Sequence, residues 1–374
     1  MWMNTALTRR ANMIYPIVQG PFGGGLSSVR LTAAVSEAGG LGSFGANHLP
    51  GDKIRQVVDE IRSLTARPFA INLWVPQGDS ETPHVDIDRF DRAAALLAPY
   101  FDELSVVMPR RPNRFGQGFR EQIEAALDAN PPLLSFVFGV PSADILLACR
   151  DRGILTAATA TTVEEALAIE AAGVDFVVAS GFEAGGHRGS FLKPPEDSFV
   201  GTFALVRQVA RRVRIPVIAA GGIADGAGIA AALSLGADAV KIGTAFLACQ
   251  ESGANNLHRE MLFSPRASDT VLSKAFSGRL ARGVRNEFVD AMRPHEATLP
   301  PFPVQNWLTG LMRGRAIDRG RSDLIALSAG QAASLVRRSE AARLMRDLVE
   351  ETESVLKDLT DGGSASSGGG MARS

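Results

Sequence analysis

The sequence predicts an α/β fold: a (β/α)8 barrel of the TIM type, with a lid or small domain inserted after the eighth strand. Short apolar runs alternate with amphipathic helical segments along most of the chain, which is typical of parallel sheets built from βαβ units. Eight such runs can be counted, and the rhythm breaks between residues 251 and 322, where arginine, proline and mixed polar residues dominate. A doubly wound sheet is the alternative, but no G-x-G-x-x-G motif follows the first strand.

The first third of the chain alternates strands with helices. Strands are expected at residues 15–19, 41–44 and 68–74, and helices at residues 31–38 and 50–61. A longer and less regular segment, residues 76–130, follows the third strand and carries prolines and a helical run near residues 89–97. Within it, residues 104–108 fit a strand as well as they fit a connection. We interpret the whole segment as an expanded connection between strands three and four.

The second half of the barrel is more regular. Five further strands are expected at residues 133–138, 154–158, 174–179, 215–220 and 239–242. Thr162, with Glu165 three residues later, forms a capping box and marks the start of the helix between strands five and six. A last amphipathic stretch, residues 327–357, is expected to be helical and to return to the barrel.

These elements divide the chain into two predicted domains and a tail. Residues 1–250 and 323–360 form the barrel, and residues 251–322 form the inserted substrate or lid domain. Residues 361–374 are rich in glycine and serine, so we expect a disordered tail.

Composition excludes several classes of protein. The 374 residues carry a formal net charge of -1, so nothing favours nucleic acid or an anionic membrane surface as a partner. No apolar run approaches the roughly 20 residues that span a bilayer, and the first residues lack the apolar core of a signal peptide. We therefore expect a cytoplasmic protein. Cys149 and Cys249 are expected in the core, and since no cluster has metal-ligand spacing, no metal is expected.

The stretch from Ser180 to Phe191 follows the sixth strand and places four glycines around His187. Glycine lets the backbone turn sharply and approach a ligand closely, and an imidazole exchanges a proton near neutral pH. At the C-terminal end of a barrel strand this combination predicts a catalytic histidine. The simpler alternative is a glycine-rich turn that carries a solvated histidine. Glu183 is either a second acid or base beside His187 or a partner of loop N–H groups, and we expect the latter. Arg188 is expected to be solvated or paired with the lid.

Two further turns predict a phosphate site. Gly221–Gly222 and Gly243–Thr244 end strands seven and eight, side by side in the usual phosphate position of this fold, although tight turns alone would also explain their glycines. Asn72 can donate and accept hydrogen bonds at a ring edge, or cap its own turn. Lys241 either pairs with a cofactor oxygen or points outward between barrel and helices. A phosphate anchor, a polar clamp and one histidine suggest a flavin mononucleotide (FMN) enzyme.

A family resemblance rests on eight short stretches: residues 15–19, 71–76, 135–141, 183–189, 216–222, 243–247, 275–279 and 329–333. With these stretches the chain resembles the nitronate monooxygenases, formerly called 2-nitropropane dioxygenases, and in particular their bacterial class I members. The resemblance covers nearly the whole chain up to the tail. The Glu-Ala-Gly-Gly-His element at residues 183–187 is shared with flavin-dependent enoyl-ACP reductases and some quinone reductases, so it is specific for the superfamily more than for the reaction.

The resemblance implies FMN bound without a covalent link, and detoxifying oxidation of alkyl nitronates, such as propionate 3-nitronate, by O2 to a carbonyl compound and nitrite. His187 would be the catalytic residue, without a metal or a reduced nicotinamide. The expected cofactor contacts are carried over from the family by position or taken from the turn after strand one. They are Pro21, Phe22, Gly23, Asn72, Ser180, Gly185, Gly221, Gly222, Lys241, Ile242, Gly243 and Thr244. The family often has glutamine where this chain has Ser180 and Lys241.

Two other functions fit part of the pattern. A nicotinamide-dependent flavin reductase acting on an enoyl thioester or a quinone would share the histidine loop. A flavin-free barrel that binds phosphosugars would share the phosphate turns, and the fold alone does not separate these functions. The partners we expect are a small nitronate and O2, with neither nucleic acid nor a membrane, and the expected assembly is a monomer or a homodimer.

Overall fold

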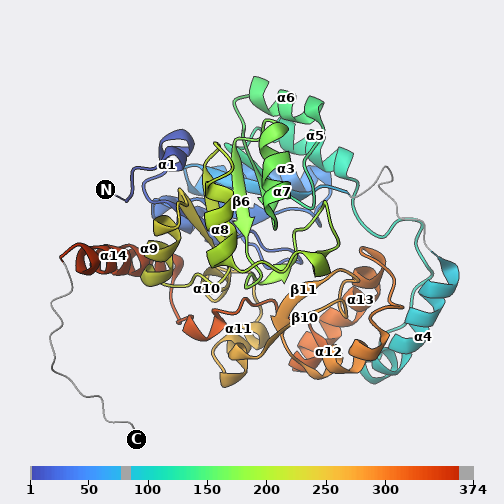
Figure 1. The fold of residues 1–374 in the computed structure, drawn as a ribbon. Helices are drawn as coiled ribbons and strands as arrows, with labels where there is room; N and C mark the ends of the chain where they lie inside the picture. Colours follow the sequence, from blue (N-terminus) through green and yellow to red (C-terminus); the bar gives the residue numbers. More distant parts are fainter. Residues whose placement is uncertain (1, 77–85, 362–374) are drawn as a thin grey trace, which may run out of the picture.

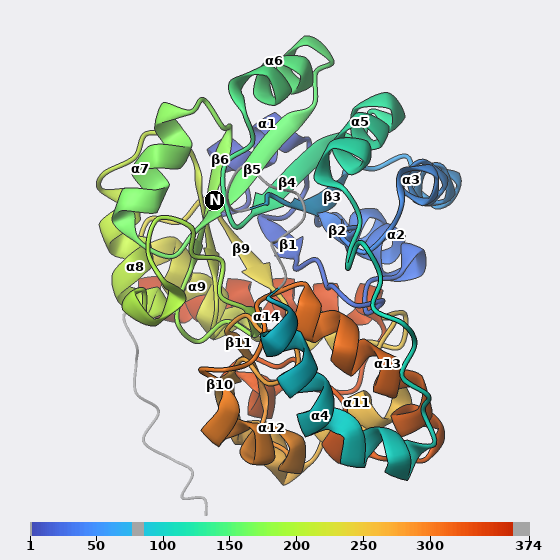
Figure 2. The same cartoon turned by 90° about the vertical axis from the view of Figure 1, so that its right-hand side faces the viewer.

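The computed structural model describes residues 2–76 and 86–361 and contains the predicted (β/α)8 barrel (Figures 1 and 2). Its eight parallel strands pair in the order β1-β9-β8-β6-β5-β4-β3-β2. Leu41 bonds to Ile17 and Gln19 through backbone hydrogen bonds of 2.9 Å, which join the two end strands and close the barrel. The strands are β1 Ile17–Gln19, β2 Gly42–Gly45, β3 Phe69–Trp74, β4 Leu133–Val137, β5 Leu155–Ala160, β6 Phe176–Ser180, β8 Val217–Ala220 and β9 Ala239–Ile242. Of the tail predicted at residues 361–374, residues 362–374 lie outside the described residues.

Helices surround the barrel, and their amphipathic faces pack against the strands. They are α1 Ala6–Ala11, α2 Val29–Glu37, α3 Gly51–Leu64, α5 Phe119–Ala129, α6 Ala143–Asp151, α7 Val163–Ala171, α8 Thr202–Ala210, α9 Gly226–Ser234, α10 Thr244–Leu247 and α14 Ala341–Thr360. Leu7 and Ala11 of α1 belong to the same apolar cluster as residues inside the barrel, such as Val18 and Ala70. Helix α1 therefore covers the N-terminal end of the barrel, opposite the expected site.

The last predicted helix begins later than expected. Residues 327–340 contain only the short 3-10 helix η5 (Ala333–Leu335), and α14 begins at Ala341 and packs against α9 and α2. Gly226 of α9 permits this contact, because a Cβ atom there would lie 2.4 Å from Cβ of Glu351. The amphipathic pattern was correct for α14 alone, and the preceding segment crosses the mouth of the barrel instead.

A second apolar cluster lies beyond the C-terminal ends of the strands and is distinct from the barrel core. It combines the helices α4 Ile87–Leu104, α11 Asn256–Leu262, α12 Glu287–Met292 and α13 Val304–Asp318. Figure 2 shows α4 lying beside α13, below the barrel. The connection predicted at residues 76–130 thus contributes a helix to this cluster. The helix ends at Leu104, and residues 105–108 have no regular structure, so they form no strand.

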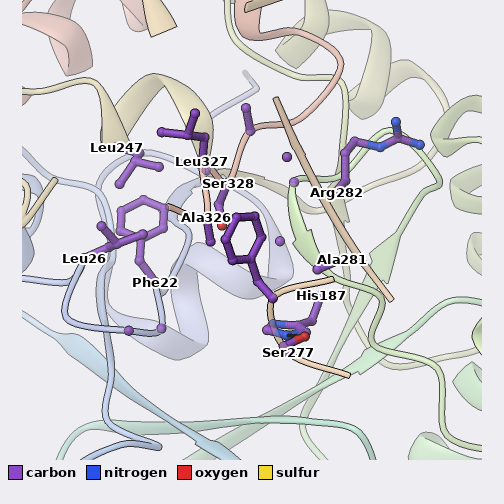
Figure 3. Close-up of a pocket in the computed structure, with 18 of the residues that line it drawn as sticks. Phe22, Leu26, His187, Leu247, Ser277, Ala281, Arg282, Ala326, Leu327 and Ser328 are labelled. Carbon is purple, nitrogen blue, oxygen red and sulfur yellow. Dashed lines mark hydrogen bonds between the residues drawn. The ribbon is translucent and has the colours of Figure 1, made fainter. Parts of the chain in front are cut away.

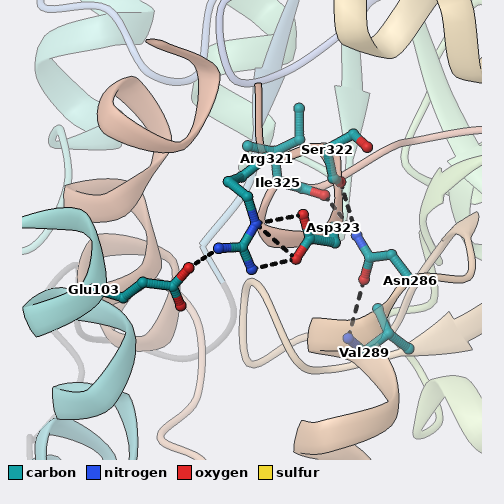
Figure 4. Close-up of polar contacts among 7 residues, drawn as sticks. All are labelled: Glu103, Asn286, Val289, Arg321, Ser322, Asp323 and Ile325. Atoms are coloured by element: carbon teal, nitrogen blue, oxygen red, sulfur yellow. Dashed lines mark hydrogen bonds and ion pairs between the residues drawn. The ribbon is translucent and has the colours of Figure 1, made fainter. Parts of the chain in front are cut away.

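Arg321 links the end of α4 to this cluster through ion pairs (Figure 4). Its guanidinium forms ion pairs with Glu103 at the end of α4 and with Asp323, the latter 2.6 Å away. Asn286 supports the same turn, because its amide donates to the carbonyl of Ile325 at 3.0 Å. Charge and backbone contacts therefore fix the α4 end although it is distant in sequence.

A small antiparallel sheet joins this cluster to the loop that follows β6. Its strands are β7 Gly186–His187, β10 Thr270–Ser273 and β11 Ala281–Val284, in the order β10-β11-β7. His187 pairs with Ala281. The predicted catalytic histidine therefore lies on a strand that is held by residues 270–284, which the sequence places in the inserted region.

Candidate functional site

A cavity of about 830 Å³ lies between the C-terminal ends of the barrel strands and the second apolar cluster (Figure 3). Every residue predicted for the site except Ile242 lines this cavity. Ile242 is buried in the layer between barrel and helices, because side chains alternate along β9 and Lys241 points inward. This corrects the expectation for Ile242, whose backbone carbonyl instead accepts a hydrogen bond of 2.8 Å from the N–H of Gly20.

His187 is half-buried in an aromatic surrounding at the cavity wall. The ring of Trp74 lies edge-on to it with 5.1 Å between centroids, and the rings of Phe138 and Phe302 lie at 6.2 Å. Burial, and then the positive charge of Arg279, lower the pKa of His187 to about 3. Both causes disfavour the imidazolium, so His187 is neutral at pH 7.

Arg188, next to His187, holds the shape of the loop. Its guanidinium donates to the carbonyls of Gly181 at 2.6 Å and Ser198 at 2.8 Å, and more weakly to that of Ser180. Only 1 % of Arg188 is exposed, so the expectation of a solvated or lid-paired arginine is wrong. Buried donors need acceptors, and loop carbonyls supply them for the two terminal nitrogens of Arg188, whereas its Nε has no hydrogen-bond partner among the described residues. Glu183 accepts from the N–H and hydroxyl of Thr202, both at 2.8 Å, which is the structural role that we favoured.

Glu165 anchors the far end of the same loop. Thr162 accepts the N–H of Glu165 at 3.2 Å, which is the first half of the predicted capping box. The carboxylate of Glu165 does not return to Thr162, but accepts from Thr161 and from the N–H groups of Phe191 and Leu192 at 2.6 and 3.1 Å. The start of α7 is therefore tied to the end of the histidine loop, which the capping-box pattern alone did not indicate.

The glycine turns after β6, β8 and β9 come together at one side of the cavity. Gly221 and Gly222 adopt positive φ values of 105° and 71°, which disfavour side chains. Gly185 approaches the backbone so closely that a Cβ atom would lie 2.6 Å from the backbone nitrogen of Gly330. The hydroxyl of Thr244 accepts the N–H of Gly330 at 2.9 Å, so its own proton remains available to a ligand.

Lys241 points into the barrel rather than outward. It pairs in register with Ala220, which pairs with Ser180, so the side chains of Lys241 and Ser180 line the same face of the sheet. Within residues 2–76 and 86–361, Lys241 has neither a hydrogen bond nor an ion pair, and burial lowers its pKa to about 8. A largely charged amine without a partner is suited to an anionic or electron-rich oxygen in the cavity.

Asn72 lines the cavity with less hydrogen-bonding capacity than expected. Its amide nitrogen donates to the carbonyl of Ser135 at 3.1 Å and to the hydroxyl of Ser135 at 3.0 Å. Both donors are used within the barrel, so Asn72 can offer a ligand only its oxygen. The expectation that it both donates and accepts at a ring edge is thus corrected.

Several cavity residues escaped the sequence analysis. Trp74 follows Asn72 by two residues on β3, so strand alternation alone could have placed it at the mouth. Asn47 and Arg313 also line the cavity, and Arg313 donates to the carbonyl of Gly24 at 3.0 Å. Arg313 lies on α13, 289 residues beyond Gly24, and no local pattern indicates its position.

Other chemistry finds no support in the described part of the chain. Cys149 and Cys249 are buried free thiols, as expected, and burial raises their pKa values to about 11 and about 12. No group of three or more His, Cys, Asp or Glu side chains within residues 2–76 and 86–361 is placed to hold a metal ion. None of the described helices is both long and apolar enough to cross a bilayer.

Comparison with known proteins decides among the remaining families. A sequence model described as nitronate monooxygenase matches residues 4–351 of the chain. The chain belongs to the nitronate monooxygenase family. It is therefore an enzyme, a flavin-dependent oxidoreductase, and the flavin-free phosphosugar barrel loses its support.

Individual relatives agree with this family. A probable nitronate monooxygenase from Staphylococcus haemolyticus is 40% identical over 358 residues, which cover 95% of this chain and 99% of that protein. Among solved structures, nitroalkane oxidase from Streptomyces ansochromogenes is 39% identical with a TM-score of 0.85, and the match covers 95% of this chain and 100% of that one. FabK from Thermotoga maritima is more distant, at 29% identity and a TM-score of 0.74 over 96% and 99% of the two chains.

Proposed function

We propose that this member of the nitronate monooxygenase family binds FMN and oxidises alkyl nitronates, such as propionate 3-nitronate, with O2 to a carbonyl compound and nitrite. The observation that carries the proposal is the single cavity in which His187, Lys241 and the glycine turns of β6, β8 and β9 meet. Location in the cytoplasm and assembly as a monomer or homodimer remain predictions.

The residues of the cavity fit FMN. The positive-φ turn at Gly221 and Gly222 lines the same cavity as the hydroxyl of Thr244, a combination that suits a phosphate group. Lys241 would meet an electron-rich oxygen of the ring system, and Asn72 would accept a ring N–H. When bound, the flavin supplies the electron transfer and the reactivity with O2.

His187 contributes as a neutral imidazole. Two roles are open to a histidine at this position: an imidazolium that stabilises an anionic substrate, and a base that removes a proton. Burial and Arg279 lower its pKa to about 3, so the imidazolium is scarce at pH 7 and the first role loses support. A lowered pKa also weakens the imidazole as a base, so the second role rests on geometry: the ring lines the cavity, and its Nδ1 has no hydrogen-bond partner among the described residues. This favours a second substrate class, neutral nitroalkanes, which must lose a proton before oxidation. The relative from Streptomyces ansochromogenes is named a nitroalkane oxidase.

Oxygen uptake tests the proposal directly. The FMN-loaded protein is mixed with propionate 3-nitronate in the absence of NADH and NADPH, and O2 consumption and nitrite are recorded. We expect rapid uptake with nitrite release. If flavin is bound but no oxygen is consumed, and NADH or NADPH bleaches the flavin under anaerobic conditions, the proposal fails and the reductase takes its place.

A further inference from the structure

The hydroxyl of Ser277 lies 2.8 Å from Nε2 of His187 (Figure 3). The same hydroxyl donates to the carbonyl of Arg279 at 2.9 Å and accepts the N–H of Arg279 at 3.2 Å. A serine hydroxyl carries one proton and two acceptor lone pairs. With its proton directed to the Arg279 carbonyl, Ser277 can only accept from His187. The proton of the imidazole therefore resides on Nε2.

Backbone geometry on both sides holds this hydrogen bond in place. Ser277 is buried, and it lies in a turn closed by a 2.8 Å hydrogen bond from the N–H of Gly278 to the carbonyl of Lys274. Gly278 has a φ of 73°, and a Cβ atom there would lie 2.1 Å from the carbonyl oxygen of Pro300, so the turn depends on glycine. On the other side, β7 fixes His187 against Ala281 of β11. Neither partner can move without disturbing a strand or a tight turn.

The second ring nitrogen of His187 is left for a ligand. Within the described residues Nδ1 has no hydrogen-bond partner, and the ring lines the cavity. The rings packed around it, those of Trp74, Phe138 and Phe302, are uncharged, and Arg279 is the charged group that affects its pKa. A histidine that is protonated at Nε2 carries its basic lone pair on Nδ1.

We propose that Ser277 is a positioning residue, which holds His187 as the Nε2–H tautomer so that Nδ1 takes the α-proton of a neutral nitroalkane. This rests on the proposed function and extends it. In this step the Cα–H bond breaks, its electron pair moves into the nitro group to give the nitronate, and an Nδ1–H bond forms. His187 leaves the step as imidazolium, and no oxidant takes part.

Nitrogen NMR of the holoprotein labelled with 15N-histidine tests the tautomer independently of any activity. The signal that disappears in His187→Asn assigns the residue. We expect Nε2 to be protonated and Nδ1 unprotonated in the wild type, a mixture of tautomers in Ser277→Ala, and the wild-type pattern again in Ser277→Thr. Ser268→Ala, which removes an exposed hydroxyl from the same region, is the control and should change nothing. A protonated Nδ1 in the wild type, or the same tautomer in Ser277→Ala, overturns the inference.

Kinetics then test the consequence. Ser277→Ala should lower kcat/KM for nitroethane by about tenfold or more, and that for ethyl nitronate by less than about twofold, because the nitronate has already lost its α-proton. Ser277→Thr should restore the rate with nitroethane. An equal loss with both substrates would show a merely structural role. If the wild type oxidises neither substrate, the proposed function fails, while the NMR result still decides the tautomer.

Discussion

Replacing Lys241 with methionine tests the electrostatics of the barrel interior. Lys241 lines the cavity without a hydrogen bond or ion pair to any described residue, and burial lowers its pKa from 10.5 to about 8. The folded protein therefore holds this proton more weakly than the unfolded chain does. The difference corresponds to a destabilisation of about 3 kcal/mol at pH 7 in the flavin-free protein, since a tenfold change in a proton equilibrium is worth about 1.4 kcal/mol.

The sign of this effect sets its pH dependence. At pH 7 the lysine is charged in both states, so the whole destabilisation applies. As the pH rises past about 8, the folded protein releases the proton while the unfolded chain keeps it, so stability increases. At pH 9.5 the remaining destabilisation is about 1.4 kcal/mol, and it vanishes above the pKa of the unfolded chain. Flavin-free Lys241→Met should therefore gain about 3 kcal/mol over the wild type at pH 7, and about half of that at pH 9.5.

Urea unfolding of the flavin-free proteins at both pH values measures this gain. Lys241→Gln, which keeps a polar side chain, separates the effect of charge from that of apolar packing and should show the same change with pH. In the holoprotein we expect the opposite consequence: Lys241→Met should bind FMN at least about tenfold more weakly, because the cation that we propose to contact the flavin is lost. A stability gain that is equal at pH 7 and pH 9.5 would refute the reasoning.

Three further variants probe other parts of the site. His187→Asn should keep bound flavin but lower turnover by about 10²-fold or more, measured by O2 uptake, and wild-type turnover would contradict its catalytic role. Gly185→Ala forces a Cβ to 2.6 Å from the Gly330 nitrogen, so flavin binding should weaken and the free energy of unfolding should fall by about 1–3 kcal/mol. Gly314→Ala, in open space on α13, is the control and should not destabilise the protein. Arg321→Ala breaks half-exposed ion pairs to Glu103 and Asp323, so urea unfolding should show a loss of only about 1 kcal/mol, and a much larger loss would mean that α4 depends on this contact.

The barrel was predictable because its signals are local. Apolar runs of strand length, glycines at their ends and helical periodicity between them each involve residues that are close in sequence. The same locality placed His187 and the glycine turns at the strand ends, since every strand of a parallel barrel ends at the same face. Residues 327–340 show the limit, because an apolar pattern there serves packing across the barrel mouth and not a helix.

The details that failed, or that the sequence left open, depend on contacts between distant segments. Arg188 is buried because its guanidinium donates to the carbonyls of Gly181 and Ser198, and no pattern around residue 188 shows that these carbonyls face it. The direction of Lys241 follows from strand register, in which a shift by one residue would exchange it with Ile242. Sequence spacing does not fix that register.

The segment of residues 277–284 does more than line the cavity. It supplies the hydroxyl that contacts His187, the arginine that stacks 3.6 Å from the Phe138 ring centroid, and the strand that pairs with β7. The barrel strand β3 and the loop after β4 bring the rings of Trp74 and Phe138 that help to bury His187, while residues 277–284 add the hydroxyl of Ser277 and the positive charge of Arg279 beside it. Changes in residues 277–284 should therefore alter the hydrogen bond and the charge at His187 while the glycine turns and Lys241 of the barrel stay in place.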